Sequence, residues 1–88
     1  MSLVEKIRDL TESTIEDLGY KIKKIEIGRE SGRKMVTIYI TKDEGYVSIN
    51  DCVTVSQAID PILEKADLIK EKWILVVSSP GLENEKGK

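Results

Sequence analysis

The sequence contains no histidine and no phenylalanine, and Cys52 is its single cysteine. Without histidine, both a zinc site that uses imidazole ligands and a catalytic triad that uses an imidazole base are excluded. A lone cysteine cannot form a disulfide within the chain. These absences remove most hydrolase chemistry, so we expect a protein that is not an enzyme and holds no metal or cofactor.

Long apolar runs are also missing, since none approaches the roughly 18 residues that a membrane-spanning helix needs. The first ten residues, MSLVEKIRDL, carry charges where a signal peptide has its apolar stretch. We therefore expect a cytoplasmic protein without membrane contact. Its 88 residues suffice for one small domain, and a core of Ile, Val and Leu suits two helices on a small sheet rather than a deep ligand cavity.

The net charge of −2 is unevenly distributed, because residues 20–42 carry +5 and the remainder carries −7. Phosphate is recognised through charge and needs no fixed spacing of bases, so this segment is a candidate for RNA contacts. Taken alone, the segment is more simply explained as a solubilising one that prevents a sheet edge from pairing with other chains, because an aromatic platform for RNA bases is missing. The candidate residues are Lys21, Lys23, Lys24, Arg29, Arg33 and Lys34.

The first segment has the periodicity of an amphipathic helix. Ser2 and Glu5 have the spacing of a capping box, and Gly19 stands where a left-handed C-terminal cap is wanted. The sequence therefore predicts a helix over residues 3–18. Its expected apolar positions are Leu3, Val4, Ile7, Leu10, Thr14, Ile15 and Leu18.

A second helix is predicted to begin after Ser48, with Asp51 completing its N-terminal cap. Pro61 lacks an amide hydrogen, and its ring collides with the carbonyl one turn earlier, so we expect a kink or a break near Asp60. Residues 64–72 are then an irregular connection. The expected apolar positions are Ile49, Cys52, Val53, Ser56, Ile59 and Leu63.

Alternating apolar residues predict three strands. In YKIKKIEIG the alternation slips by one residue at Lys23 and Lys24, which indicates a β-bulge. RESGRK supplies a turn and MVTIYITK continues the alternation, so residues 20–42 predict a β-hairpin. The last strand is predicted over residues 73–78. The side chains expected on the inner face of the second strand are Val36, Ile38 and Ile40.

The order α-β-β-α-β predicts an α+β fold, a two-layer sandwich with both helices on one face of a three-stranded sheet. In the last strand, Ile74 and Val76 point away from the helices, so the second face of the sheet is apolar as well. Such a patch is usually covered. We therefore expect the 88-residue chain to form a weak homodimer through this face.

Three stretches of the sequence resemble the bacterial ribosome maturation factor RimP family. IEDLGYKIKKIEI is similar to the end of its first helix and its first strand, INDCVTVSQAIDPIL to its second helix, and WILVVSSPGL to its last strand. The specific parts of the resemblance are the Asp51-Cys52 pair and the Ser-Ser-Pro-Gly-Leu motif, formed by Ser78, Ser79, Pro80, Gly81 and Leu82.

The resemblance implies an N-terminal domain with the shape of an RNA-binding KH fold, which a small Sm-like β-barrel follows in the family. It also implies a non-catalytic role in small-subunit assembly, with ribosomal RNA and ribosomal protein as partners. Residues 1–79 would then be this domain, and residues 80–88 an interdomain joint or a tail, with the second domain absent from this chain. The GxxG loop of KH domains is missing, so KH-type base recognition is not expected.

Two alternatives remain open at this point. The family usually continues after the motif with an acid, Arg, Pro and Leu, whereas residues 83–86 are Glu-Asn-Glu-Lys, as a short stand-alone paralogue would allow. The second alternative is an adaptor that pairs with another protein through the apolar sheet face and binds no RNA. Its binding would be insensitive to salt, whereas RNA binding weakens steeply as salt rises.

Overall fold

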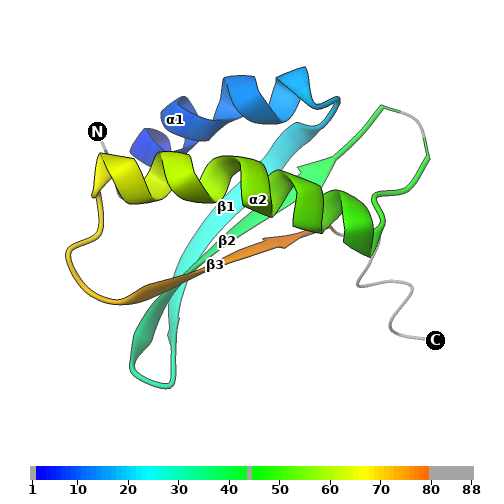
Figure 1. Ribbon diagram of the computed structural model, residues 1–88. Coiled ribbons are helices and arrows are strands. Elements are labelled where there is room, and N and C mark those ends of the chain that lie inside the picture. Colours follow the sequence, from blue (N-terminus) through cyan, green and yellow to red (C-terminus); the bar gives the residue numbers. More distant parts are fainter. Residues whose placement is uncertain (1, 44, 80–88) are drawn as a thin grey trace.

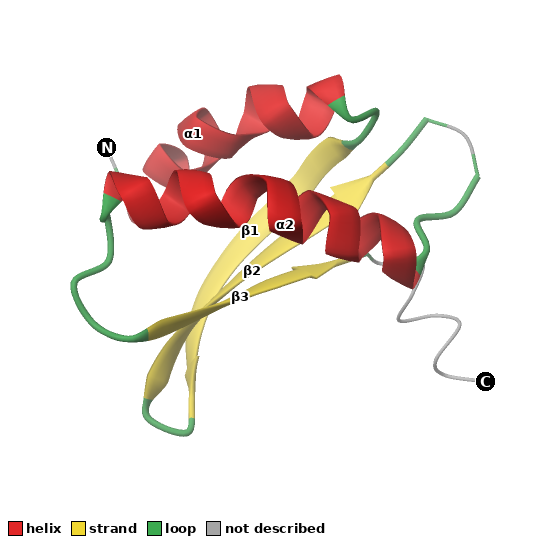
Figure 2. Ribbon diagram, in the orientation of Figure 1, coloured by secondary structure: helices red, strands yellow, loops and turns green. Residues whose placement is uncertain are grey.

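The computed structural model describes residues 2–43 and 45–79. Both helices lie on the same face of the sheet, as Figure 1 and Figure 2 show. The predicted α-β-β-α-β sandwich is therefore confirmed. Its elements are helix α1 (Leu3–Asp17), strands β1 (Lys21–Glu30) and β2 (Arg33–Thr41), helix α2 (Ile49–Ala66) and strand β3 (Trp73–Ser78).

The strands lie in the order β1-β2-β3. β1 pairs antiparallel with β2, and the register shifts between Ile22 and Lys24, which confirms the predicted bulge. Glu30 pairs with Arg33, so the turn is shorter than the six residues expected and consists of residues 31–32 alone. Both turn residues have positive φ, 54° at Ser31 and 80° at Gly32, as a tight hairpin turn requires.

The core lies between the sheet and the two helices. Val36, Ile38 and Ile40 of β2 are fully buried, as the alternation of the strand predicts. β2 is the central strand, so its inner face has side chains on every side. From α2 the core receives Cys52, Val55, Ile59 and Leu63.

The buried face of α1 differs from the expected one. Its fully buried row is Ile7, Thr11 and Ile15, whereas Leu10 and Leu18 are exposed. Thr11 tolerates burial because its hydroxyl donates a hydrogen bond of 2.8 Å to the carbonyl of Ile7 within the same helix. A polar residue at the centre of the buried row is invisible to a count of apolar positions.

Of the predicted kink or break near Asp60, the break is wrong, because α2 continues through Pro61 to Ala66. Pro61 has no amide hydrogen to donate to the carbonyl of Gln57, one turn earlier in the helix. Both residues are exposed, so water can donate to that carbonyl instead. Ile59 and Leu63, on either side of the proline, are buried and hold both parts of the helix on the sheet. The irregular connection therefore begins only at residue 67.

The α2 face also differs from the expected one. Val55, which the apolar pattern did not include, is fully buried. Ile49 and Val53 were expected in the core, yet their exposed fractions are 70% and 46%. The helix is therefore rotated about its axis relative to the predicted orientation, which leaves an apolar pair in solvent.

The open face of the sheet carries Met35, Ile74 and Val76, as expected from the strand alternation. All three are half-buried. Thr37, which pairs with Val76 in the register, is 8% exposed. None of the strongly exposed large apolar side chains in the described residues lies on this face.

Candidate functional site

The β1–β2 hairpin carries all six candidate bases, but they do not form one patch. Three of them lie near the start of β1, and the other three lie beside the turn at residues 31–32. The turn end projects beyond the helices (Figure 1). We call Lys21, Lys23 and Lys24 the proximal group, and Arg29, Arg33 and Lys34 the tip group.

Within the tip group, Glu71 binds two of the three bases. Its carboxylate lies 3.0 Å from Nη2 of Arg29 and 3.6 Å from Nζ of Lys34. It is brought there by the chain entering β3, where the amide of Lys34 donates a hydrogen bond of 3.3 Å to the carbonyl of Lys72. The tip of the hairpin is therefore partly neutralised by an acid from a distant part of the sequence.

The proximal group is paired in a similar way. Nζ of Lys21 lies 3.3 Å from the carboxylate of Asp43, and Nζ of Lys24 lies 3.1 Å from that of Glu26. Nζ of Lys24 also lies 5.2 Å from the centroid of the Tyr39 ring, within the range of a cation–π contact.

Two candidate bases have no such partner within the part of the chain that the structure describes. Lys23 lies at the bulge of β1, and Arg33 begins β2. Both are exposed, and no ion pair involves either of them. They are therefore the bases whose charge is most available to a phosphate.

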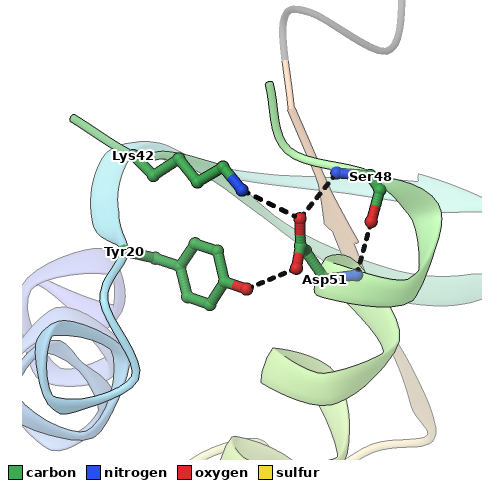
Figure 3. Close-up of polar contacts among 4 residues, drawn as sticks. All are labelled: Tyr20, Lys42, Ser48 and Asp51. Carbon is green, nitrogen blue, oxygen red and sulfur yellow. Dashed lines mark hydrogen bonds and ion pairs between the residues drawn. The ribbon is translucent and has the colours of Figure 1, made fainter. Parts of the chain in front are cut away.

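A polar network fixes the start of α2 to the sheet (Figure 3). The hydroxyl of Tyr20 donates a hydrogen bond of 2.5 Å to Oδ1 of Asp51, and Nζ of Lys42 lies 3.5 Å from Oδ2. The amide of Ser48 donates to the same Oδ2 at 2.8 Å, and the hydroxyl of Ser48 accepts from the Asp51 amide at 3.1 Å. The second capping box is thus confirmed and extended by residues from outside the helix.

Electrostatics agree with a structural role for this network. The backbone hydrogen bond from Ser48, followed by that from the Tyr20 hydroxyl, lowers the pKa of Asp51 to about 2. The same contact with Asp51 raises the pKa of Tyr20. An aspartate so firmly ionised is a poor proton carrier near neutral pH, so it is not suited to general acid catalysis.

Cys52, beside Asp51, points into the core. It is 6% exposed, and burial, with the negative charge of Asp51, raises the pKa of its thiol. The thiol is part of the buried apolar core, whereas the thiolate would be the reactive form. The Asp51-Cys52 pair therefore has two structural functions, an anchor on the helix surface and a core contact.

Residues 2–43 and 45–79 offer neither a metal site nor a membrane span. No group of three or more potential ligands among Cys, Asp and Glu in these ranges is placed to hold a metal ion. No helix in that part of the chain is long and apolar enough to cross a membrane.

The joint predicted over residues 78–82 is described only at its beginning. Ser78 is the last residue of β3 and is half-buried, and Ser79 is 4% exposed. Pro80, Gly81 and Leu82 lie outside the described residues. The position of the motif at the end of the last strand agrees with the prediction, and its role as a joint stays a prediction.

The arrangement of helices, hairpin and anchored α2 can be compared with known families. The profile described as the RimP N-terminal domain matches residues 10–83. The chain belongs to the RimP family. The match includes the second half of α1, all of α2 and all three strands, so the resemblance seen in three separate stretches extends over residues 10–83.

RimP proteins are ribosome maturation factors, a class that in general acts without enzymatic activity. The sequence identified the bases of the hairpin but missed Glu71, which pairs with Arg29 and Lys34. No local pattern marks Glu71, because its contact arises only when β3 pairs in parallel with β2.

Proposed function

We propose that this RimP domain assists assembly of the small ribosomal subunit in the cytoplasm, through contacts with ribosomal RNA and ribosomal protein. The family supports the ribosomal role. The observation that carries the RNA contact is the projection of the hairpin turn, which lies beside the tip group, beyond the helices (Figure 1). A projecting hairpin reaches into grooves that a flat surface cannot enter.

The tip combines a net positive charge with a defined shape. Residues 29–34 and 71–72 together carry a net charge of +2, although Glu71 holds two of the bases. Arg33, which no acid pairs in the described structure, stands directly after the turn. The contacts proposed here are to phosphate oxygens, which position a protein on RNA without reading its sequence.

The test is RNA binding by two matched variants. One carries Arg29→Gln, Arg33→Gln and Lys34→Gln; the control carries Lys6→Gln, Lys65→Gln and Lys70→Gln, on exposed positions outside the hairpin. Both variants have the same net charge, so only the place of the change differs. Binding to a fluorescent small-subunit RNA fragment is measured at several salt concentrations.

The tip variant should bind more weakly than the control. The slope of log affinity against log salt should fall by roughly 0.7 to 0.9 for each phosphate that the substituted side chains no longer neutralise. Equal weakening in both variants would mean that net charge alone attracts RNA. Unchanged affinity and slope in the tip variant would show that the tip does not contact RNA and would support a solubilising role for the hairpin.

Ser78, Ser79, Pro80, Gly81 and Leu82 are proposed as the joint to a following Sm-like domain. The support is that Ser78 ends β3, the last element in the part of the chain that the structure describes. The sequence encoded beyond Lys88 in the genome decides this directly, because a barrel-like continuation is required by the proposal.

A second candidate function, an adaptor that binds protein and no RNA, is favoured by the open sheet face. Met35, Ile74 and Val76 form its apolar part, beside Glu30 and Arg33. Binding of the small subunit that persists at high salt, and is abolished by Ile74→Lys with Val76→Lys, would identify this function. Dissociation at high salt supports the RNA contact instead.

A further inference from the structure

The two edges of the sheet are protected very differently. β1 forms one edge and carries a bulge together with six charged residues among its ten, KIKKIEIGRE. Bulges and charges are the usual means by which natural sheets prevent pairing with other chains. β3 forms the opposite edge, and its sequence, WILVVS, has no charge, no proline and no register shift.

Backbone groups of β3 point to solvent along this edge. The amide of Lys34 in β2 donates to the carbonyl of Lys72, just before β3. In a parallel pair, every second residue of a strand bonds to the neighbouring strand, so Lys72 is followed by residues 74 and 76. Ile74 and Val76 therefore direct their backbone groups towards β2, whereas Leu75 and Val77 direct theirs outward. No strand of the described chain pairs with this edge.

Helix α2 adds an apolar border beside the same strand. Ile49 and Val53, with exposed fractions of 70% and 46%, share a hollow with Val77. The other residues that line this hollow, Cys52, Ser56 and Gln57, are uncharged. An unpaired strand edge and an exposed apolar helix surface are therefore adjacent.

We propose that β3 is a pairing edge at which two copies of this chain join in antiparallel fashion about a two-fold axis. A two-fold axis between two copies of one edge strand makes the strands antiparallel, and the pairing is self-complementary. Because β3 carries no charge, no antiparallel register places like charges opposite each other. The dimer would contain one continuous sheet, with the two helices of each copy on the same face.

The direction of α2 favours a second copy over an isolated peptide strand. Ile49 lies near Val77 and Leu63 lies near Trp73, so α2 runs antiparallel to β3. When two β3 strands pair, the two α2 helices come to lie along the seam, where Ile49 and Val53 can be covered. A bound peptide would satisfy the strand edge but leave this helix surface in water.

The edge is distinct from the open sheet face, on which a homodimer was expected from the sequence. The apolar side chains of the open face are half-buried, and Glu30 and Arg33 lie beside them. The proposed seam is one short strand and part of a helix, an area at the small end of specific interfaces. We therefore expect a weak dimer that dissociates on dilution.

Amide hydrogen exchange, followed by NMR at low and high protein concentration, tests the edge directly. The amides of Leu75 and Val77 should become protected only at high concentration, whereas those of Ile74 and Val76 should be protected at both. Sedimentation equilibrium at the same concentrations reports the oligomeric state. A monomer throughout, or a dimer in which the Leu75 and Val77 amides exchange as in the monomer, overturns the proposal.

Substitutions then locate the seam. Ile49→Lys with Val53→Lys should shift dimerisation to at least about tenfold higher concentration, because charges would be buried at the seam. The control, Leu10→Lys with Leu18→Lys, changes two exposed apolar residues of α1 and should leave the dimer intact. Circular dichroism verifies that each variant is folded. A dimer weakened equally by both variants, or only by changes on the open face, contradicts the proposal.

Discussion

The hydroxyl of Tyr20 donates a hydrogen bond to the carboxylate of Asp51, although the two residues are 31 positions apart in the sequence. The contact joins the residue before β1 to the first turn of α2 (Figure 3). Nζ of Lys42, just after β2, lies near the second carboxylate oxygen of Asp51. One carboxylate thus caps a helix and fixes that helix to the sheet, which sets the surface that α2 presents.

The first prediction concerns acid stability. The pKa of Asp51 in the folded protein, about 2, lies below its ordinary value of 3.8, so the unfolded chain binds a proton more readily. Its contribution is therefore fully present above about pH 4 and disappears as the pH falls towards about 2. Urea midpoints measured across this range should fall more for the unmodified protein than for Asp51→Asn.

The matched control for that experiment is Asp60→Asn, on the exposed face of the same helix. This variant should keep the pH dependence of the unmodified protein. If Asp51→Asn also keeps it, the Asp51 network contributes nothing to acid stability and the carboxylate is only a surface group.

The second prediction concerns the proline within α2. Pro61→Ala restores an amide donor to the carbonyl of Gln57 and removes the ring that crowds it, while the side chain at this position is exposed. We expect the substitution to stabilise the protein by about 2 kcal/mol. Proline costs about 3 kcal/mol in a helix interior, but it also restricts the unfolded chain, and the variant loses that smaller benefit. Urea unfolding measures the change, and a destabilised Pro61→Ala would mean that the ring itself packs usefully.

The same proline shows where prediction from the sequence ends. Caps are local, so both capping boxes and the bulge were found from neighbouring residues. Pro61 was misjudged because its cost is local, whereas the burial of Ile59 and Leu63 that outweighs it depends on the sheet beneath. Thr11 was missed for a related reason, since its hydroxyl is satisfied inside the helix and leaves no mark in the apolar pattern.

The site was less predictable than the fold. The sequence shows a run of bases, but the strands separate it into two groups, and Glu71 reaches one of them through a parallel pairing between distant segments. Ion pairs of this kind depend on which strands become neighbours. A count of charge along the chain therefore overstates the positive charge that the hairpin presents.

The third prediction concerns Cys52, whose thiol is buried and has a raised pKa. It should react with iodoacetamide far more slowly than a free thiol at neutral pH, because both access and thiolate formation are hindered. The matched control is Val53→Cys in a Cys52→Ala background, which places a thiol at a position with 46% exposure. Mass spectrometry follows both reactions. Equal rates would show that the start of α2 opens readily.

The last prediction uses Glu71 to separate the two interpretations of the hairpin tip. Glu71→Gln removes the negative charge that holds Arg29 at 3.0 Å and Lys34 at 3.6 Å. If the tip contacts phosphate, RNA affinity should rise roughly two- to fivefold at low salt, since an exposed ion pair is worth up to about 1 kcal/mol. The folding stability of the domain should at the same time fall slightly, because the ion pairs of Glu71 are lost.

Fluorescence anisotropy with small-subunit RNA measures the affinity, and Glu64→Gln on the exposed surface of α2 is the control for net charge. A rise confined to Glu71→Gln supports phosphate contact at the tip, whereas equal affinities in both variants would leave the ion pairs of Glu71 as stabilisers of the sheet alone.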